Sequence, residues 1–375
     1  MSRSDDGLVT GKLDGRLLAI VSGKGGSGKT MIAAEIADVV AKNSDLEVIL
    51  LDADLGTGGL SYYLGLHYIR NIRNGLTDLL LKPQPDSPEE LLQRVELPGY
   101  GSYLFLPVGD FRKLHSNRRL AASDAFPVPH DDLAVLGETL NRLRAPKTLV
   151  IVDCRGGVDS ELAEICSVVD EILLISEADA TSFQATRHVA EALADLDLGR
   201  KITGFILNKV LEDPAVLLRS ASSAFGAQFL GAIPFDLDAT KSFLVGDLPS
   251  RRSIFALHVQ EAISKAYPKS VDRPIGRVWQ GKDYANLSLR TRGESLAGLV
   301  FALTISVLGL FSAINLISGV GNLTSLLVLT ALLSLCGLIA SIDASRKLVG
   351  AMLDRYFGSA GGRSEDWRQR YTWDR

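Results

Sequence analysis

The sequence predicts an α/β fold with a mostly parallel, doubly wound sheet, followed by a two-helix transmembrane hairpin. Three observations lead to this prediction. A glycine-rich loop joins an apolar, strand-like segment to a helical one near residue 23. Strand-like and helical patterns then alternate to about residue 267, which is typical of a parallel sheet covered on both faces. From Ser295 to Ile342 there is no charged residue.

Composition limits the classes of function. The 375-residue chain carries 40 lysines and arginines against 44 aspartates and glutamates, so no overall basic field favours nucleic acid. Its cysteines, Cys154, Cys166 and Cys336, lack the paired spacing of a zinc site or a disulfide framework. Residues 1–15 are polar, lack the apolar core of a secretory signal, and are expected to form a flexible lead-in.

The glycine-rich loop predicts a phosphate-binding site. It follows a strand at Leu17–Val21, fits the P-loop pattern from Gly23, and leads into a helix at Met31–Val40. Glycines let backbone N–H groups approach phosphate oxygens, Lys29 can neutralise the β- and γ-phosphates, and the Thr30 hydroxyl can contact Mg²⁺. The predicted cofactor-binding residues are Gly25, Gly26, Ser27, Gly28, Lys29 and Thr30. The fold is therefore expected to be of P-loop NTPase type.

A second lysine in the loop, Lys24, narrows the class of P-loop NTPase. The run KGGSGKT resembles the deviant Walker-A ATPases of the MinD/ParA family. In that family the extra lysine reaches the nucleotide of a partner subunit, so the resemblance implies an ATP-dependent homodimer with Lys24 and Lys29 as catalytic residues. The alternative is that Lys24 is a solvated loop charge.

Two carboxylates follow the next strand, Glu47–Leu51. Because strand side chains alternate, Asp52 and Asp54 can face the same way beside the loop. The resemblance implies that Asp54 orients the attacking water as a catalytic residue, and that Asp52 contacts Mg²⁺ through its water shell. Two solvated turn aspartates are the alternative.

The middle of the chain is less informative. Lys82–Gly99 is expected to be a loop with a short helix, followed by a strand at Tyr103–Pro107 and a helix at Asp132–Leu143. A basic cluster lies between the last two, at residues 112–119. It can meet a partner or anionic headgroups, although such runs are more often solvated surface.

The strand Thr148–Asp153 ends in an acid, which has the form of a Walker-B strand. Asp153 is the predicted residue that holds the hydration shell of the metal. The following Cys154-Arg155-Gly156-Gly157 departs from the family, whose turn is usually small or carries proline. The Arg155 guanidinium can stabilise charge during phosphoryl transfer, or it can point to solvent or to the dimer partner. The departure puts the rate of hydrolysis in doubt.

Two further strand–helix units and a last strand complete the domain. The expected segments are strands at Glu171–Ser176, Ile202–Asn208 and Phe229–Pro234, with helices at Thr181–Leu196, after Pro214 and at Ser253–Ala266. The resemblance spans Leu17–Tyr267. It implies that Asn208 contacts the adenine base and that the segment at Pro234 brackets it.

The uncharged run divides at a glycine-rich break into Leu296–Ile317 and Leu323–Ile342. Each part is long enough to cross a bilayer as a helix, and basic residues flank the pair on both sides. The expected organisation is the lead-in (1–15), a P-loop ATPase domain (16–267), a linker (268–293), the hairpin (294–342) and a cytoplasmic tail (343–375). This places the protein in the inner (cytoplasmic) membrane, multi-pass, with the ATPase domain in the cytoplasm. A buried helical pair is the alternative to the hairpin.

The leading interpretation is a membrane-anchored ATPase that dimerises on ATP, requires Mg²⁺, and uses hydrolysis as a switch to position or assemble a protein partner. One alternative is a tyrosine autokinase resembling the polysaccharide-export kinases, although those usually carry the hairpin before the ATPase and lack a lysine of the Lys24 type. Another is a nucleotide-binding scaffold with little turnover, a reading that Arg155 motivates.

Overall fold

A twisted sheet organises the residues that the computed structural model describes, which are 13–81, 87–96, 101–110, 130–211, 214–279 and 283 of the 375. Within these ranges the sheet has eight strands in the order β3-β4-β2-β5-β1-β6-β7-β8. The strands are β1 (Arg16–Ser22), β2 (Glu47–Asp52), β3 (Gln93–Glu96), β4 (Ser102–Leu106), β5 (Thr148–Gly156), β6 (Glu171–Glu177), β7 (Ile202–Val210) and β8 (Phe229–Pro234). All neighbours pair in parallel except β3 with β4. The mostly parallel sheet is confirmed.

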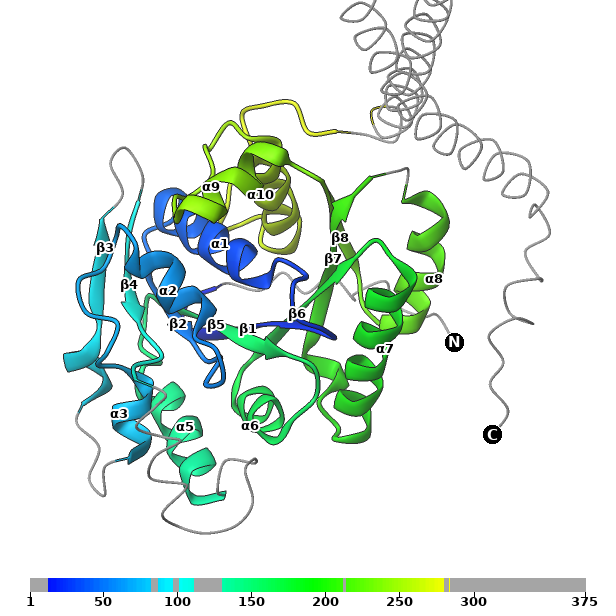
Figure 1. The fold of residues 1–375 in the computed structure, drawn as a ribbon. Helices are drawn as coiled ribbons and strands as arrows, with labels where there is room; N and C mark the ends of the chain where they lie inside the picture. Colours follow the sequence, from blue (N-terminus) through cyan, green and yellow to red (C-terminus); the bar gives the residue numbers. More distant parts are fainter. Residues whose placement is uncertain are drawn as a thin grey trace, which may run out of the picture. The chain divides into compact units, whose positions relative to one another are not determined.

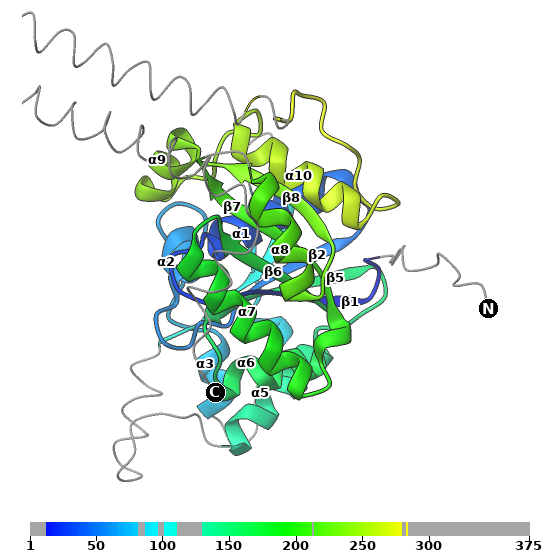
Figure 2. The ribbon, with the colours of Figure 1, turned by 90° about the vertical axis from the view of Figure 1, so that its right-hand side faces the viewer.

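Helices cover both faces of the sheet (Figure 1). One face carries α1 (Lys29–Asn43), α2 (Gly59–Gly65), α9 (Leu237–Val245) and α10 (Ile254–Ala266). The other carries α3 (Leu76–Leu81), α5 (His130–Arg142), α6 (Ser160–Val168), α7 (Ala180–Asp195) and α8 (Ala215–Phe225). Short 3₁₀ helices lie at Pro88–Leu91 and Gly199–Lys201. Figure 2 shows α9 and α10 on one side of the sheet and α5 and α6 on the other, so the fold is doubly wound.

Strand β1 is apolar from Leu17 to Val21 because both of its faces are covered. Leu17, Ala19 and Val21 pack into the core beneath α5 to α8, whereas Leu18 and Ile20 pack into the core beneath α1 and α10. Successive side chains of a strand point to opposite faces, so a central strand with helices on both sides buries the side chains of both faces. This places the end of β1, and the loop that follows it, at the centre of one sheet edge.

The expectation for Lys82–Gly99 is partly wrong. The short helix is present at Pro88–Leu91, but Gln93–Glu96 forms β3, an antiparallel strand at the edge of the sheet. Only Val95 of this strand is buried, because an edge strand has one neighbour and partial cover. A segment with a single apolar residue has no strand pattern in its sequence.

The folded part extends beyond the expected boundaries at both ends. Leu13 is 1% exposed and packs in the core beside α1, so the described end of the lead-in belongs to the domain. After α10, Val271 is buried, and the backbone N–H of Trp279 donates to Nε2 of His258 at 2.9 Å. Val271 and Trp279, which lie in the expected linker, therefore contact the folded domain.

Several predicted segments lie outside the described residues: 1–12 of the lead-in, the basic cluster 112–119, the hairpin 294–342 and the tail 343–375. Among the helices of the described ranges, none combines the length and apolar character that a membrane crossing requires.

Candidate nucleotide-binding site

The glycine-rich loop lies between the end of β1 and the start of α1, at the edge where the parallel strands end. Because β2 and β5 lie on one side of β1 and β6 and β7 on the other, the carboxyl ends of these strands converge on the loop. The structure thereby brings the predicted residues of the loop together with Asp52, Asp153 and Asn208 at one edge. Pro234 ends β8 and pairs with Val210 beside this group.

The conformation of the loop requires glycine. Gly26 and Gly28 have φ angles of 84° and 88°, and Gly28 is the N-cap of α1. A Cβ at Gly28 would lie 2.2 Å from Nδ2 of Asn208, whose amide donates to the Ser27 carbonyl at 2.8 Å. Asn208 therefore braces the loop in this structure, and its contact with a base stays a prediction.

The end of β5 requires glycine at position 156. A Cβ at Gly156 would lie 2.5 Å from the carbonyl carbon of Lys24, and the N–H of Gly157 donates to the Ser22 carbonyl at 2.9 Å. The end of β5 thus buttresses the start of the loop at backbone contact. Only glycine fits this approach.

Asp153 has the environment of a metal-site carboxylate. It is 2% exposed, and its Oδ1 has no hydrogen-bond partner among the described residues. Burial and the Asp52 charge raise its pKa to about 7, against the lowering effects of Lys29 and of a hydrogen bond with Thr30. An orphaned carboxylate oxygen beside a threonine hydroxyl and a buried lysine suits a hydrated divalent cation, so these residues fit Mg²⁺.

Asp52 is engaged differently from its neighbour. Its Oδ2 accepts from the N–H and the hydroxyl of Ser61, both at 2.7 Å, and its Oδ1 accepts from the N–H of Asp54 at 3.1 Å. Burial raises the pKa of Asp52 to about 6 despite these donors. Asp52 therefore anchors α2 to the end of β2, and its outer contact with Mg²⁺ stays a prediction.

Asp54 closes its own turn. Its Oδ1 accepts from the N–H groups of Gly56 and Thr57 at 3.2 and 3.1 Å, and its Oδ2 accepts from the Thr57 hydroxyl at 2.5 Å. A carboxylate has about four acceptor positions, and three of them are used within this turn. Its role in orienting a water remains a prediction.

Arg155 is exposed, and its guanidinium lies over the same turn. A Cβ at Gly56 would be 3.2 Å from Cζ of Arg155 and 3.4 Å from Oδ1 of Asp54. The guanidinium therefore lies near Asp54, over the turn that follows β2. Its role in charge stabilisation stays a prediction, as does a contact with solvent or with the dimer partner.

Lys24 pairs within its own chain. Its Nζ lies 3.7 Å from Oε2 of Glu177 and 3.5 Å from Oδ2 of Asp179, and it donates to Oγ1 of Thr181 at 3.4 Å. Lys29 is 7% exposed, and its charge acts on Asp153. The two lysines of the loop therefore have separate environments.

Sequence reasoning missed Glu177 and Lys209. Nζ of Lys209 donates to the Gly26 carbonyl and pairs with Oε1 of Glu177 at 2.8 Å, from a backbone with φ of 55°. Each follows an apolar strand that ends beside the loop, which is the signal that could have indicated them. Charged residues at strand ends are common, however, and this signal is weak by itself.

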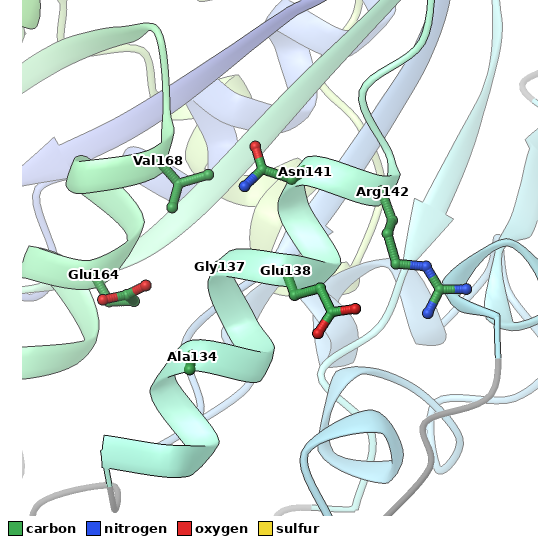
Figure 3. Close-up of a pocket in the computed structure, with 7 residues that line it drawn as sticks. All are labelled: Ala134, Gly137, Glu138, Asn141, Arg142, Glu164 and Val168. Atoms are coloured by element: carbon green, nitrogen blue, oxygen red, sulfur yellow. The ribbon is translucent and has the colours of Figure 1, made fainter.

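A separate groove of about 500 Å³ lies between α5 and α6 (Figure 3). Glu164 and Val168 of α6 face α5 across it, and a Cβ at Gly137 would lie 2.6 Å from Oε1 of Glu164. It contains none of the predicted phosphate or metal residues. We therefore place the nucleotide site at the loop.

The buried acids predict a pH dependence of stability. Burial, with a contribution from Asp38, raises the pKa of Glu35 to about 8, so this side chain keeps its proton in the fold where the unfolded chain loses it. Asp153, at about 7, acts in the same direction. The native state then binds more protons than the unfolded state, and the free energy of unfolding should fall by on the order of 2 kcal/mol from pH 6.5 to pH 8.

Urea denaturation in EDTA without nucleotide measures this slope. The window starts at pH 6.5 because burial lowers the pKa of His258 to about 4, which opposes the trend at lower pH. Glu35→Gln should flatten the curve. A free energy of unfolding that rises from pH 6.5 to pH 8 would contradict the raised pKa values of Glu35 and Asp153.

Comparison with known proteins agrees with this site. The model of the CobQ/CobB/MinD/ParA nucleotide binding domain matches residues 18–249. An uncharacterized ATP-binding protein of Methanocaldococcus jannaschii is 25% identical over 231 residues, which cover 61% of this chain and 78% of the relative. The septum site-determining protein MinD of Synechocystis is 22% identical over 286 residues, 76% of this chain and 92% of the relative.

Solved structures show the same fold. The MinC:MinD cell division protein complex of Aquifex aeolicus includes a chain with a TM-score of 0.52 and 20% identity, covering 71% of this chain and 100% of that one. The Cyanothece McdA(D38A)–ATP complex has a TM-score of 0.53 and 16% identity, covering 71% and 98%. At these identities the likeness concerns the fold.

Proposed function

Because this chain belongs to the CobQ/CobB/MinD/ParA nucleotide-binding family, we propose that it binds Mg²⁺ and ATP, associates into a homodimer when it does so, and hydrolyses ATP to reset. The observation that carries the proposal is the pair of lysines in one loop. Lys29 is buried towards Asp153, whereas Lys24 is half-exposed and turned away from it. Because Lys24 contacts Glu177 and Asp179, it is not committed to its own phosphate cradle, which supports a role at the nucleotide of another subunit.

The residues divide the chemistry between them. Backbone N–H groups of the loop and the Lys29 ammonium would hold the phosphates, while Thr30 would contact Mg²⁺ and Asp153 would hold its hydration shell. When bound, Mg²⁺ supplies positive charge that offsets the charge on the phosphate oxygens. Phosphoryl transfer depends mainly on alignment and charge stabilisation. We therefore assign charge stabilisation to Lys24 from the partner and orientation of the attacking water to Asp54.

The output is proposed from relatives and from the sequence. A septum site-determining protein and a MinC:MinD complex are among the similar proteins, which favours a switch that positions or assembles a protein partner. The uncharged run at 295–342 supports a hairpin that keeps this switch at the cytoplasmic face of the inner membrane.

Full-length protein in detergent tests the switch. With Mg²⁺ and ATP, the protein mass measured by light scattering should double, and phosphate release should follow; ADP should leave the mass unchanged. The membrane hairpin is tested separately. Extraction of native membranes with alkaline carbonate should leave the protein in the pellet.

Other outcomes decide between the alternatives. Binding of ATP with neither hydrolysis nor a change of mass would favour the nucleotide-binding scaffold. Phosphotyrosine formed during incubation with ATP would favour the autokinase.

A further inference from the structure

Four charged side chains meet at the edge of the nucleotide site. Lys24 comes from the glycine-rich loop, Glu177 from the end of β6, Asp179 from the N-cap of α7 and Lys209 from the end of β7. Their Nζ-to-carboxylate distances are 3.7 Å for Lys24–Glu177, 3.5 Å for Lys24–Asp179 and 2.8 Å for Lys209–Glu177. The group is electrically balanced, with two positive and two negative charges.

Glu177 lies between the two lysines. In the register of β6 and β7 it is opposite Asn208, which brings the neighbouring Lys209 against its Oε1, while Oε2 faces Lys24. Lys209 also donates to the Gly26 carbonyl at the tip of the loop. One carboxylate is thus linked to two points of the same short loop, directly to Lys24 at its start and indirectly, through Lys209, to Gly26.

Asp179 has a different task. It accepts hydrogen bonds from the N–H groups of Thr181 and Ser182, both at 2.9 Å, and from both hydroxyls, at 2.6 and 2.5 Å. Although partial burial acts in the opposite direction, the hydrogen bonds from Ser182 and Thr181 and the charge of Lys24 lower the pKa of Asp179. These bonds are those of a helix N-cap. In the described residues, the side-chain partners of Glu177 are the two lysines.

A lysine paired in its own chain cannot at the same time reach a partner's nucleotide. We propose that Glu177 is a positioning residue that holds Lys24 in its own subunit and thereby restrains ATP-dependent association. This rests on the proposed function, in which Lys24 acts across the dimer. Association then requires Lys24 to break its ion pair with Glu177 and to contact the phosphates bound by the partner. When Lys24 leaves, Lys209 keeps Glu177 in place.

The restraint is modest in size. The Lys24 and Glu177 side chains are 37% and 20% exposed, and solvent screens such a pair. Releasing it should change association by about two- to fivefold. This is enough to adjust the ATP or protein concentration at which the switch closes.

Chemical labelling of Lys24 tests the restraint without a dimer. The full-length protein in detergent, free of nucleotide, is acetylated briefly with an amine-reactive ester, and the modification of Lys24 is quantified by mass spectrometry against the exposed Lys147. Glu177→Gln should raise the labelling of Lys24 by about two- to fivefold. The matched control is Glu191→Gln, which removes a carboxylate of α7 that pairs with Arg187 at 2.7 Å and should have no effect on Lys24.

Association with Mg²⁺ and ATP is then measured on the same variants. Glu177→Gln should lower the protein concentration at half-association by about two- to fivefold, with an unchanged thermal unfolding midpoint. Lys209→Met removes the other ion pair of Glu177 and leaves the carboxylate that contacts Lys24, so it should not raise the labelling of Lys24. This variant separates the effects of the two ion pairs of Glu177. Equal labelling of Lys24 in wild type and Glu177→Gln would overturn the proposal. Increased labelling without association in any variant would support the restraint and refute the dimer.

Discussion

Lys24→Ala is expected to lower ATP hydrolysis by on the order of 10³-fold, the scale of a cation supplied in trans to a transferring phosphoryl group. Nucleotide affinity should remain nearly unchanged. The physical reason is that Nζ of Lys24 faces Glu177 and Asp179, whereas the buried Lys29 is the lysine directed at Asp153. Steady-state phosphate release and the binding of a fluorescent ATP analogue measure the two quantities separately.

Matched variants make this result interpretable. Lys241→Ala removes another exposed lysine, on α9, and should change neither quantity. Asp54→Ala should also stop hydrolysis but should hold the protein in the associated form, whereas Lys24→Ala stays monomeric with ATP. A loss of affinity in Lys24→Ala as large as that in Lys29→Ala would show that Lys24 serves its own site.

Asp153→Asn should change stability and ligand binding in opposite directions. Burial and the Asp52 charge raise the pKa of Asp153 to about 7, so at pH 8 the fold bears the cost of an ionised, buried carboxylate. Asparagine removes this cost and should raise the free energy of unfolding by on the order of 1–3 kcal/mol without ligand. It also removes the negative charge that would hold the hydration shell of Mg²⁺, so the stabilisation of about 2.7 kcal/mol expected at a hundred times the dissociation constant should be lost.

Urea denaturation at pH 8, with and without Mg²⁺ and ATP, measures both effects. Asp52→Asn is the control, because Asp52 is also buried but accepts three hydrogen bonds from Ser61 and Asp54. The amide NH₂ group of asparagine would face an N–H or hydroxyl donor that the carboxylate now accepts from, so this variant should be destabilised by about 1–3 kcal/mol. If Asp153→Asn is destabilised to the same degree, Asp153 is a structural carboxylate and the metal site lies elsewhere.

The sequence was sufficient for the elements whose signal is local. The apolar segments Leu17–Val21 and Thr148–Asp153 became β1 and β5, and Phe229–Pro234 became β8 with the same bounds. Gln93–Glu96 was missed, because an edge strand with one buried residue has no periodicity to detect. The helices α6 and α9, at Ser160–Val168 and Leu237–Val245, had no separate expectation either, because each is short.

By itself, therefore, the sequence determined the phosphate loop, the strand that ends at Asp153 and the alternation that produces a parallel sheet, because motif spacing and periodicity are properties of neighbouring residues. Only the tertiary structure decided what Lys24 contacts. Glu177 is 153 positions away in the chain, and it reaches Lys24 because β6 pairs with β1 at the centre of the sheet. The order and register of strands determine which strand ends meet, and an ion pair between two such ends has no signal in either segment alone.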